Sequence, residues 1–258
     1  MGHGELAADP GEPSWRQQGR GDAGRDRAEK SGALPESGRD AARARVARGS
    51  RRRWPVTLER GPVRLRPLRR RDETQWNQIR RSNLTWLSPW EATLPPGAER
   101  GPATWRSMLS ALRRQAREGR MLPWAICYRS GAGQDHRLVG QLTVSGIVGG
   151  SAAWGQIGYW VDQQWAGRGI VPTAVAMAVD HCFGVLGLHR IEIAIRPENT
   201  KSLRVVEKLG IRSEGIRSRY LHIDHDWRDH LIFALTPEEV PKGLLARWEG
   251  QRGDAGQH

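Results

Sequence analysis

Two glycines that flank an arginine form the most chemically informative segment of the chain. Gln164 is followed by Gly167, Arg168, Gly169 and Ile170, where a strand-like run gives way to an apolar helical run. Glycine at both positions permits a tight turn and leaves room for a close ligand, so successive backbone N–H groups can point outward. Together with Arg168 and the positive end of a helix that begins near Ile170, these groups predict a phosphate-binding turn.

Two better-known phosphate motifs do not fit this segment. A Walker A loop would continue with Gly-Lys-Ser or Gly-Lys-Thr, which is not found here. A dinucleotide-binding fingerprint would have a third glycine where Pro172 stands. Because Gly-x-Gly alone also occurs in turns that bind nothing, a purely structural turn remains the alternative.

A strand and a helix must hold this turn, and the sequence predicts both. The run from Ile170 to Leu186 is apolar on almost every side, which predicts a helix packed against a sheet. Asp72 is expected to cap an earlier helix and Pro102 to open another. The predicted strands are 63–68, 122–128, 138–148, 154–161 and 190–195, the predicted helices are 72–82, 102–119, 170–186 and 200–209, and 215–235 is a hairpin. This order indicates an α/β fold with a mixed, mostly antiparallel sheet flanked by helices in a single domain.

Composition divides the 258 residues into three parts. Residues 1–53 hold 12 of the 41 Lys and Arg residues and 8 of the 28 Asp and Glu residues, but few apolar ones. So little apolar surface cannot offset the entropy of ordering, which predicts a disordered, Arg-rich extension. The folded domain is expected at 54–240 and a tail at 241–258. A short basic helix on RNA at 41–53 and a misassigned start codon are the alternatives for the extension.

Charge and composition also exclude several classes of protein. The net charge of +13 favours contact with a polyanion but does not define a fold. No apolar run approaches the ~20 residues that a membrane span needs. The 2 cysteines are too few for a disulfide scaffold. We therefore expect a cytoplasmic protein, monomeric or homodimeric, with no membrane contact.

Two motifs resemble those of one enzyme superfamily. Gln164-x-x-Gly167-x-Gly169, between a strand and a helix, resembles the pyrophosphate-binding signature of the GNAT superfamily of acyl-CoA-dependent N-acetyltransferases. Asn199-Thr200-Lys201-Ser202 is similar to the Asn-x-x-Ser helix of one branch, the RimJ/RimL-type ribosomal-protein-alanine N-acetyltransferases. The resemblance covers residues 60–237, and implies a GNAT-like domain that uses acetyl-CoA as co-substrate and no metal.

The resemblance also implies where the cofactor binds. It assigns pyrophosphate to the turn from Gln164 to Ile170. It assigns the pantetheine arm to the backbone of Trp160 and Val161, in a bulged strand that splays from its neighbour. It further implies that the Asn199 side chain lies beside pantetheine. From the residues alone Asn199 is a good helix N-cap, and the two roles are compatible.

Ser202 and Glu192 are the candidate catalytic residues. Many superfamily members carry a tyrosine as general acid later in the Asn199 helix, where this chain has Val206, and the branch resemblance points to Ser202 instead. Some relatives have a base at the position of Ala194, and Glu192 lies one pleat away on the same strand face. The alternatives are a serine with a local hydrogen bond and an ordinary exposed glutamate. Since an α-amino group has a pKa of ~7.7–8.0, a strong base is not essential.

The acceptor side has fewer signals. Trp86 and Trp90 lie where early helices of this branch form the acceptor groove, although both can equally pack against the sheet. Arg217 and Arg219 are candidates for contact with an acidic surface or with the 3′-phosphate of coenzyme A. The His and Asp residues at 222–230 indicate a hairpin tip rather than a metal site.

Together these features predict an acetyl-CoA-dependent N-acetyltransferase that acts on the N-terminal α-amino group of a protein, with ribosomal proteins as the candidate partners. One alternative is an enzyme of the same fold that acetylates a small amine. Another is an RNA-binding module led by the basic extension, although the domain lacks the repeated exposed aromatic residues of a single-strand platform.

Overall fold

The computed structural model describes residues 54–98, 101–102 and 104–254. The extension predicted at 1–53, with its alternative basic helix, lies outside the described residues. Within the described part, no helix is both long enough and apolar enough to cross a bilayer.

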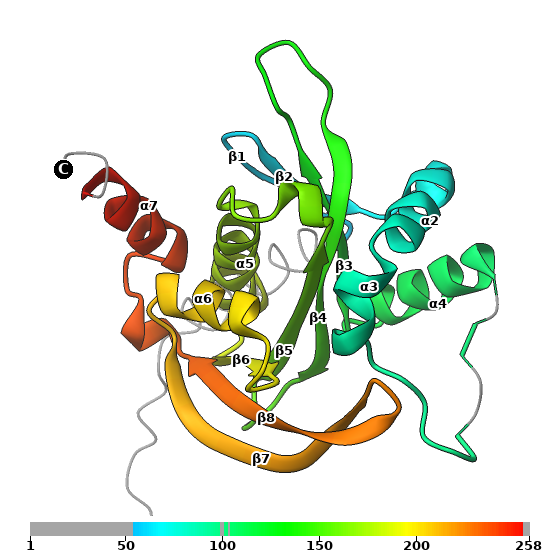
Figure 1. Ribbon diagram of the computed structural model, residues 1–258. Coiled ribbons are helices and arrows are strands. Elements are labelled where there is room, and N and C mark those ends of the chain that lie inside the picture. The colour runs from blue at the N-terminus through cyan, green and yellow to red at the C-terminus, as the bar shows by residue number, and fades with distance from the viewer. Residues whose placement is uncertain (1–53, 99–100, 103, 255–258) are drawn as a thin grey trace, which may run out of the picture. The chain divides into compact units, whose positions relative to one another are not determined.

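A single sheet forms the centre of the domain and confirms the predicted fold class. Its strands are β1 (Leu58–Arg60), β2 (Val63–Pro67), β3 (Leu122–Tyr128), β4 (Arg137–Val148), β5 (Trp154–Val161), β6 (Arg190–Ile195), β7 (Arg212–Ile223) and β8 (Asp226–Leu235). They lie in the order β1-β2-β3-β4-β5-β6-β8-β7 (Figure 1). Strands β5 and β6 are parallel, and the other neighbouring pairs are antiparallel. The sheet is therefore mixed and mostly antiparallel.

Helices cover both faces of the sheet. They are α2 (Glu73–Ser82), α3 (Leu84–Leu87), α4 (Trp105–Arg117), α5 (Ile170–His181), α6 (Thr200–Lys208) and α7 (Leu244–Asp254). Alternating side chains of β3 enter two different cores, as the period of a strand requires. Trp124 and Ile126 pack with α5, α6 and α7, whereas Ala125 and Cys127 pack with α2 and α4. We call these two sides the α5 face and the α4 face.

Helix α5 confirms the prediction of a helix buried against the sheet. Every residue from Ile170 to Val179 is buried. At roughly 1.5–3 kcal/mol for each fully buried Val or Ile side chain, this helix is a major source of stability. The helical run does continue to Leu186, but its last turn, Cys182–Leu186, is π-helical.

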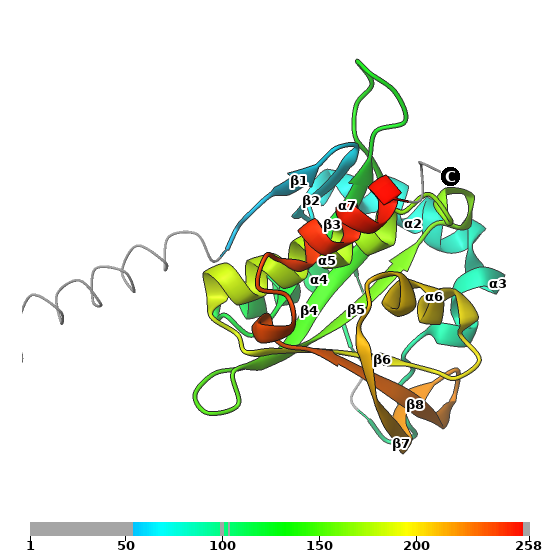
Figure 2. The ribbon, with the colours of Figure 1, turned by 90° about the vertical axis from the view of Figure 1, so that its left-hand side faces the viewer.

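Helix α7 corrects the prediction that residues 241–258 are a tail. It packs along α5 (Figure 2), with Leu244 fully buried and Trp248 6% exposed. The Trp248 Nε1 donates to Thr173 Oγ1 at 2.9 Å, and the Asp180 carboxylate accepts from the backbone N–H of Leu244 at 2.6 Å. The folded domain thus extends through α7, because this segment has a buried apolar face and a partner for its first N–H groups.

Two helix starts also differ from those predicted. Helix α4 begins at Trp105 with Thr104 as its N-cap, so Pro102 lies outside it. Asp72 precedes α2 but accepts from Arg69 N and from the Arg66 guanidinium, both at 2.7 Å, and makes no cap bond to α2. The Asp72 carboxylate therefore forms an ion pair with Arg66 in place of the helix cap that the sequence predicts.

Candidate active site

The two parallel strands separate halfway along their length. Strands β5 and β6 pair at Trp154↔Arg190, Gly155↔Ile191 and Gln156↔Glu192, and no further. Beyond that point they border a cleft of about 1030 Å³, lined by Ile157, Tyr159 and Ile193 among others. The separation leaves strand edges unpaired inside the domain, where an extended ligand can bind between them.

The expected splay is present, but the expected bulge in β5 is not. The register between β4 and β5 runs without a shift from Ser145↔Gln156 to Gly140↔Val161, and shifts only beyond Ser145. Trp160 and Val161 both line the cleft. The Val161 carbonyl, however, accepts a hydrogen bond from Trp86 Nε1 at 3.1 Å, so this backbone oxygen already has a partner.

The glycine turn lies at the mouth of this cleft. Gly167 and Gly169 have φ of +80° and +75°, in the left-handed region that favours glycine, and α5 begins directly afterwards at Ile170. All three residues line the cleft. The first N–H groups of α5 are thus presented at the cleft, as an anion site requires.

Gln164 and Arg168 do not line the cleft. The Gln164 Nε2 donates to Asp162 Oδ2 at 2.6 Å, and the Arg168 guanidinium lies 4.8 Å from the centre of the Trp165 ring. In this structure the two side chains shape and cover the turn rather than extend toward a ligand.

A buried Asp–Asn pair holds the turn, and sequence analysis missed it. Asp162 and Asn83 are 4% and 5% exposed, and Asn83 Nδ2 donates to Asp162 Oδ1 at 3.0 Å. Asn83 Oδ1 accepts from Gln163 N at 2.8 Å. These bonds satisfy a buried carboxylate and tie the end of α2 to the turn. A pair separated by 79 residues has no local sequence signal.

Asn199 and Ser202 both line the cleft at the start of α6. Asn199 is the N-cap of this helix, and its Oδ1 accepts from Ser202 N at 3.1 Å. This bond stabilises the first turn of α6. It uses the backbone N–H of Ser202 and not the side-chain hydroxyl.

Tyr159 is a second hydroxyl in this part of the cleft. Burial raises the pKa of Tyr159 above its usual range, and the neighbouring Ser202 partly offsets that rise. The Tyr159 hydroxyl is nevertheless buried without a partner in hydrogen-bond geometry among the described residues. Because buried hydroxyls are normally hydrogen-bonded, this one is available to a ligand.

Three basic residues of α6 also border the cleft. Lys201, Arg204 and Lys208 are exposed, recur at helical spacing and line the cleft together. Their positive charges border the same cleft as the glycine turn, where they can attract a polyphosphate.

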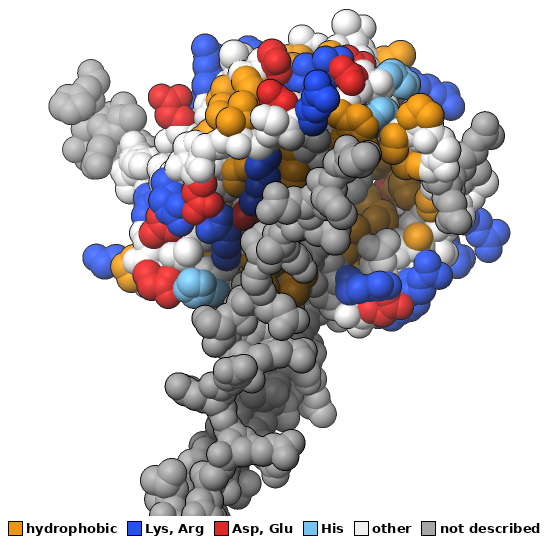
Figure 3. All heavy atoms as spheres, turned by 90° about the horizontal axis from the view of Figure 1, so that it is seen from below, with side chains coloured by type: hydrophobic (Ala, Val, Ile, Leu, Met, Phe, Trp, Pro, Cys, Tyr) orange, Lys and Arg blue, Asp and Glu red, His pale blue; other side chains and the backbone are white. Residues whose placement is uncertain are grey.

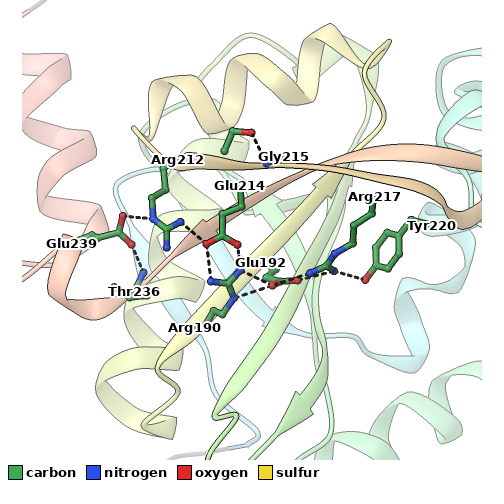
Figure 4. A network of polar contacts seen from close by, with 10 residues as sticks. Arg190, Glu192, Arg212, Glu214, Gly215, Arg217, Tyr220, Thr236 and Glu239 are labelled. Carbon is green, nitrogen blue, oxygen red and sulfur yellow. Dashed lines mark hydrogen bonds and ion pairs between the residues drawn. The ribbon is translucent and has the colours of Figure 1, made fainter. Parts of the chain in front are cut away.

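Glu192, predicted as a base, does not line the cleft. The residue is 4% exposed, and its carboxylate accepts from Arg190 Nη2 at 2.7 Å and Arg217 Nη1 at 3.2 Å (Figure 4). The network continues to Glu214, whose pKa Arg190 and Arg212 lower to about 2. Two guanidinium groups therefore occupy the oxygens that a base would need, which argues against the predicted catalytic role.

The same network accounts for Arg217, which was predicted to contact an acidic surface or a phosphate. Its guanidinium is engaged by Glu192 and by the Tyr220 hydroxyl at 3.1 Å. Nearby, the backbone N–H of Arg219 donates to Asp229 Oδ1 at 2.8 Å. Figure 3, which views the domain from the β7 and β8 side, shows Lys and Arg interspersed with Asp and Glu.

The α4-face side of the cleft has a small, polar floor. Gln141, Thr143 and Ser145 of β4 lie opposite Trp160, Gly158 and Gln156 of β5, and all but Gln156 line the cleft. A Cβ atom added to Gly158 would have no heavy atom within 4 Å other than those of its own residue and its chain neighbours, so the space next to this residue is open. Trp86 and Trp90 also border this side. The floor thus leaves room for a second ligand next to the splayed strands.

The charged groups around this floor are mostly paired. Glu91 forms an ion pair with Arg80, and Glu198 pairs with Arg196 at 3.2 Å. Arg196 also donates to Pro89 O at 2.7 Å and lies over the Trp90 ring.

The histidines and aspartates at 222–230 do not assemble into a metal site. His222 Nδ1 lies 2.8 Å from Thr93 Oγ1, while His230 lines the cleft. Across the described residues, no group of three or more His, Cys, Asp or Glu side chains is arranged to hold a metal ion.

Comparisons with known proteins agree with this geometry. The family model described as "Acetyltransferase (GNAT) domain" matches residues 63–212. The chain is 28% identical over 187 residues to "[Ribosomal protein uS5]-alanine N-acetyltransferase" of Escherichia coli, covering 72% of this chain and 93% of that one. It is 40% identical over 106 residues to "Probable N-acetyltransferase YjcK" of Bacillus subtilis, covering 41% of this chain and 59% of that one.

A solved structure extends the similarity to almost the whole domain. The "Mycobacterium smegmatis RimJ in complex with CoA-disulfide" superposes with a TM-score of 0.68 and 41% identity, covering 77% of this chain and 95% of that chain. The cleft between the splayed strands, with the glycine turn beside it, suits an extended ligand that carries phosphates, as acetyl-CoA does. The chain belongs to the GNAT acetyltransferase family. Within it, the chain is an acetyl-CoA-dependent N-acetyltransferase of the RimJ/RimL type.

Proposed function

We propose that this enzyme transfers the acetyl group of acetyl-CoA to the N-terminal α-amino group of a protein, with a ribosomal protein as the acceptor. The name of the E. coli relative, a ribosomal-protein-alanine N-acetyltransferase, supports this acceptor class. The observation that carries the proposal is the floor of the cleft on the α4 face, small and polar, open above Gly158 and bordered by Trp86 and Trp90. Such a floor suits a slender peptide terminus.

The charges in the cleft favour this acceptor over a polyamine. A polyamine keeps a second ammonium group, which a binding site would match with an unpaired carboxylate. Among the described lining residues, the carboxylates are Glu91 and Glu198, and each already pairs with an arginine. The cleft therefore lacks the free negative charge that a polyamine would require.

Acetyl-CoA would occupy the splay between β5 and β6. The N–H groups at Gly167, Gly169 and Ile170 would bind the pyrophosphate. The pantetheine arm would extend along Trp160 and Val161 past Asn199, which brings the sulfur to the first turn of α6. Ser202 would then donate a proton to the departing thiolate.

We further expect the basic residues of α6 to recognise the 3′-phosphate of coenzyme A. Replacing Lys201, Arg204 and Lys208 together with glutamine should raise the KM for acetyl-CoA about tenfold, since three exposed contacts of ~0.5 kcal/mol each sum to that ratio. The KM for acetyl-dephospho-CoA, which lacks this phosphate, should rise much less. Steady-state kinetics with both thioesters measures the difference.

The matched control is Lys242→Gln, an exposed lysine outside the cleft. The assignment is wrong if the triple variant raises the KM for both thioesters by the same factor. The three positive charges would then act on a group that the two thioesters share.

A thiol-release assay tests the proposed function. Peptides that begin with Ala, Ser, Thr or Met are compared with spermidine and single amino acids as acceptors of acetyl-CoA. We expect kcat/KM to be highest for a peptide, because the cleft accommodates a chain terminus and offers no free carboxylate to a polycation. Turnover confined to small amines would overturn the protein-acceptor proposal.

A further inference from the structure

His230 is a buried histidine in the cleft that the roles above leave unused. It is 3% exposed and yet lines the cleft. It lies on β8, where Ala194↔Ile232 and Ile195↔Leu231 fix the register against β6. Because side chains alternate along a strand, His230 shares a face with Ile232 and Ala194. It therefore lies on the α4 face, at the end of β6 that diverges from β5.

One hydrogen bond fixes the tautomer of His230. Its Nδ1 lies 2.9 Å from the backbone oxygen of Arg228. A carbonyl oxygen can only accept, so Nδ1 carries the proton and Nε2 of the neutral ring has the lone pair. The ring packs edge-on against Tyr220, with centroids 5.9 Å apart. Within the described part of the chain, no hydrogen bond occupies Nε2.

The surroundings of His230 favour the neutral ring. Burial lowers the pKa of His230 most strongly, and the Arg196 charge lowers it further. The bond to the Arg228 carbonyl and the charges of Asp229 and Glu198 act in the opposite direction without reversing the shift. From β7, Arg217 is the register partner of His230, and its guanidinium is paired with Glu192. At neutral pH the ring therefore offers a lone pair and does not repel an ammonium group.

Other groups in the cleft are less suited to take a proton. Glu91 and Glu198 each form an ion pair with an arginine. Glu192 lies outside the cleft and forms ion pairs with two arginines. Tyr159 packs against the core of the α5 face, and Ser202 of α6 lies beside it, where the sulfur is expected. His230 and Ser202 thus flank the gap between β5 and β6 from its two sides.

We propose that Nε2 of His230 takes the proton of the acceptor ammonium group, which makes His230 the general base. The neutral amine then uses its lone pair to form the N–C bond to the thioester carbonyl. The C–S bond breaks with its electron pair on sulfur, and the thiolate takes a proton from Ser202. The second proton lost by nitrogen restores Ser202 through water, and His230 releases its proton to solvent. The step requires only that the acceptor is an amine, and it does not depend on whether that amine belongs to a protein or to a small molecule.

Two variants separate proton transfer from hydrogen bonding. His230→Asn retains a donor in the place of Nδ1 for the Arg228 carbonyl and removes Nε2. His230→Gln places an amide near Nε2 that can accept a hydrogen bond but not a proton. Both are assayed from pH 6 to 9.5 with the best acceptor of the wild-type enzyme, and acetyl-CoA affinity is measured by calorimetry.

We expect both variants to lower kcat about 100-fold at pH 7 with unchanged acetyl-CoA affinity, as for loss of a general base. The deficit should narrow as pH rises above ~8, because the free amine then needs no base. The proposal would be overturned if the loss of kcat were the same at every pH, or if neither variant lost kcat. It would also be overturned if Glu198→Gln, and not His230→Asn, showed the pH-dependent loss of kcat. Since the acceptor is chosen by the wild-type enzyme, a small-amine preference would refute the protein acceptor and leave this test intact.

Discussion

Ser202→Ala should lower kcat by about 100-fold or more while the KM for acetyl-CoA stays near its wild-type value. A thiolate that leaves without a proton donor is a poor leaving group, and general acids contribute ~10²–10⁴ in rate. The Ser202 backbone N–H, which donates to Asn199, is unchanged by the substitution. Alanine is also favoured in a helix, so α6 should remain intact. Steady-state kinetics with saturating acceptor measures the loss.

Tyr159→Phe is the matched variant for this prediction. The Tyr159 hydroxyl is buried beside Ser202, and among the described residues no atom meets it in full hydrogen-bond geometry. If Ser202 is the acid, Tyr159→Phe should reduce kcat far less than Ser202→Ala does. An unchanged kcat in Ser202→Ala, together with a large loss in Tyr159→Phe, would transfer the role to the tyrosine.

Gly140→Ala should give the largest loss of stability, about 3 kcal/mol, which corresponds to a Tm lower by ~6–12 °C. A Cβ at position 140 would lie 2.3 Å from the Trp160 carbonyl oxygen and 3.0 Å from Val161 Cα. Both neighbours are backbone atoms of β5, which cannot move aside as a flexible side chain does. Strand β5 would have to shift, and with it the wall of the cofactor cleft.

Gly158→Ala on the adjacent strand is the control for this prediction. Its added Cβ meets nothing within 4 Å, so thermal unfolding should shift little. The methyl group would project into the acceptor side of the cleft, and acceptor KM should therefore rise. Similar Tm values for the two variants would mean that β4 and β5 are not as close at Gly140 as described.

The parts of the site that depend on neighbouring residues could be predicted from the sequence. The glycine turn, the apolar helix after it and the Asn199 cap with Ser202 each arise within a few residues of one another. The bounds of β5 and β6 also follow from apolar runs ended by turn residues, and both agree with the structure. Local pattern therefore identified the cofactor side of the cleft.

The parts that depend on long-range contacts could not be predicted. Glu192 has the residue type of a base, but Arg190 and the distant Arg217 engage it. Asn83 supports the turn from a different helix, and α7 packs on α5 through Trp248 and Thr173. His230 follows a hairpin tip, and only the register of β8 against β6 brings it to the cleft. In each case the sheet order, not the local sequence, decides which groups meet.

The position of the acetyl group on a product peptide shows whether the enzyme acetylates a protein N-terminus. The enzyme is incubated with acetyl-CoA and a peptide that begins with alanine and contains an internal lysine, and the product is sequenced by tandem mass spectrometry. We expect a single acetyl group on the α-amino nitrogen of the first residue, with the lysine unmodified. Acetylation of the lysine, or an unmodified peptide in a mixture where spermidine is acetylated, would contradict it.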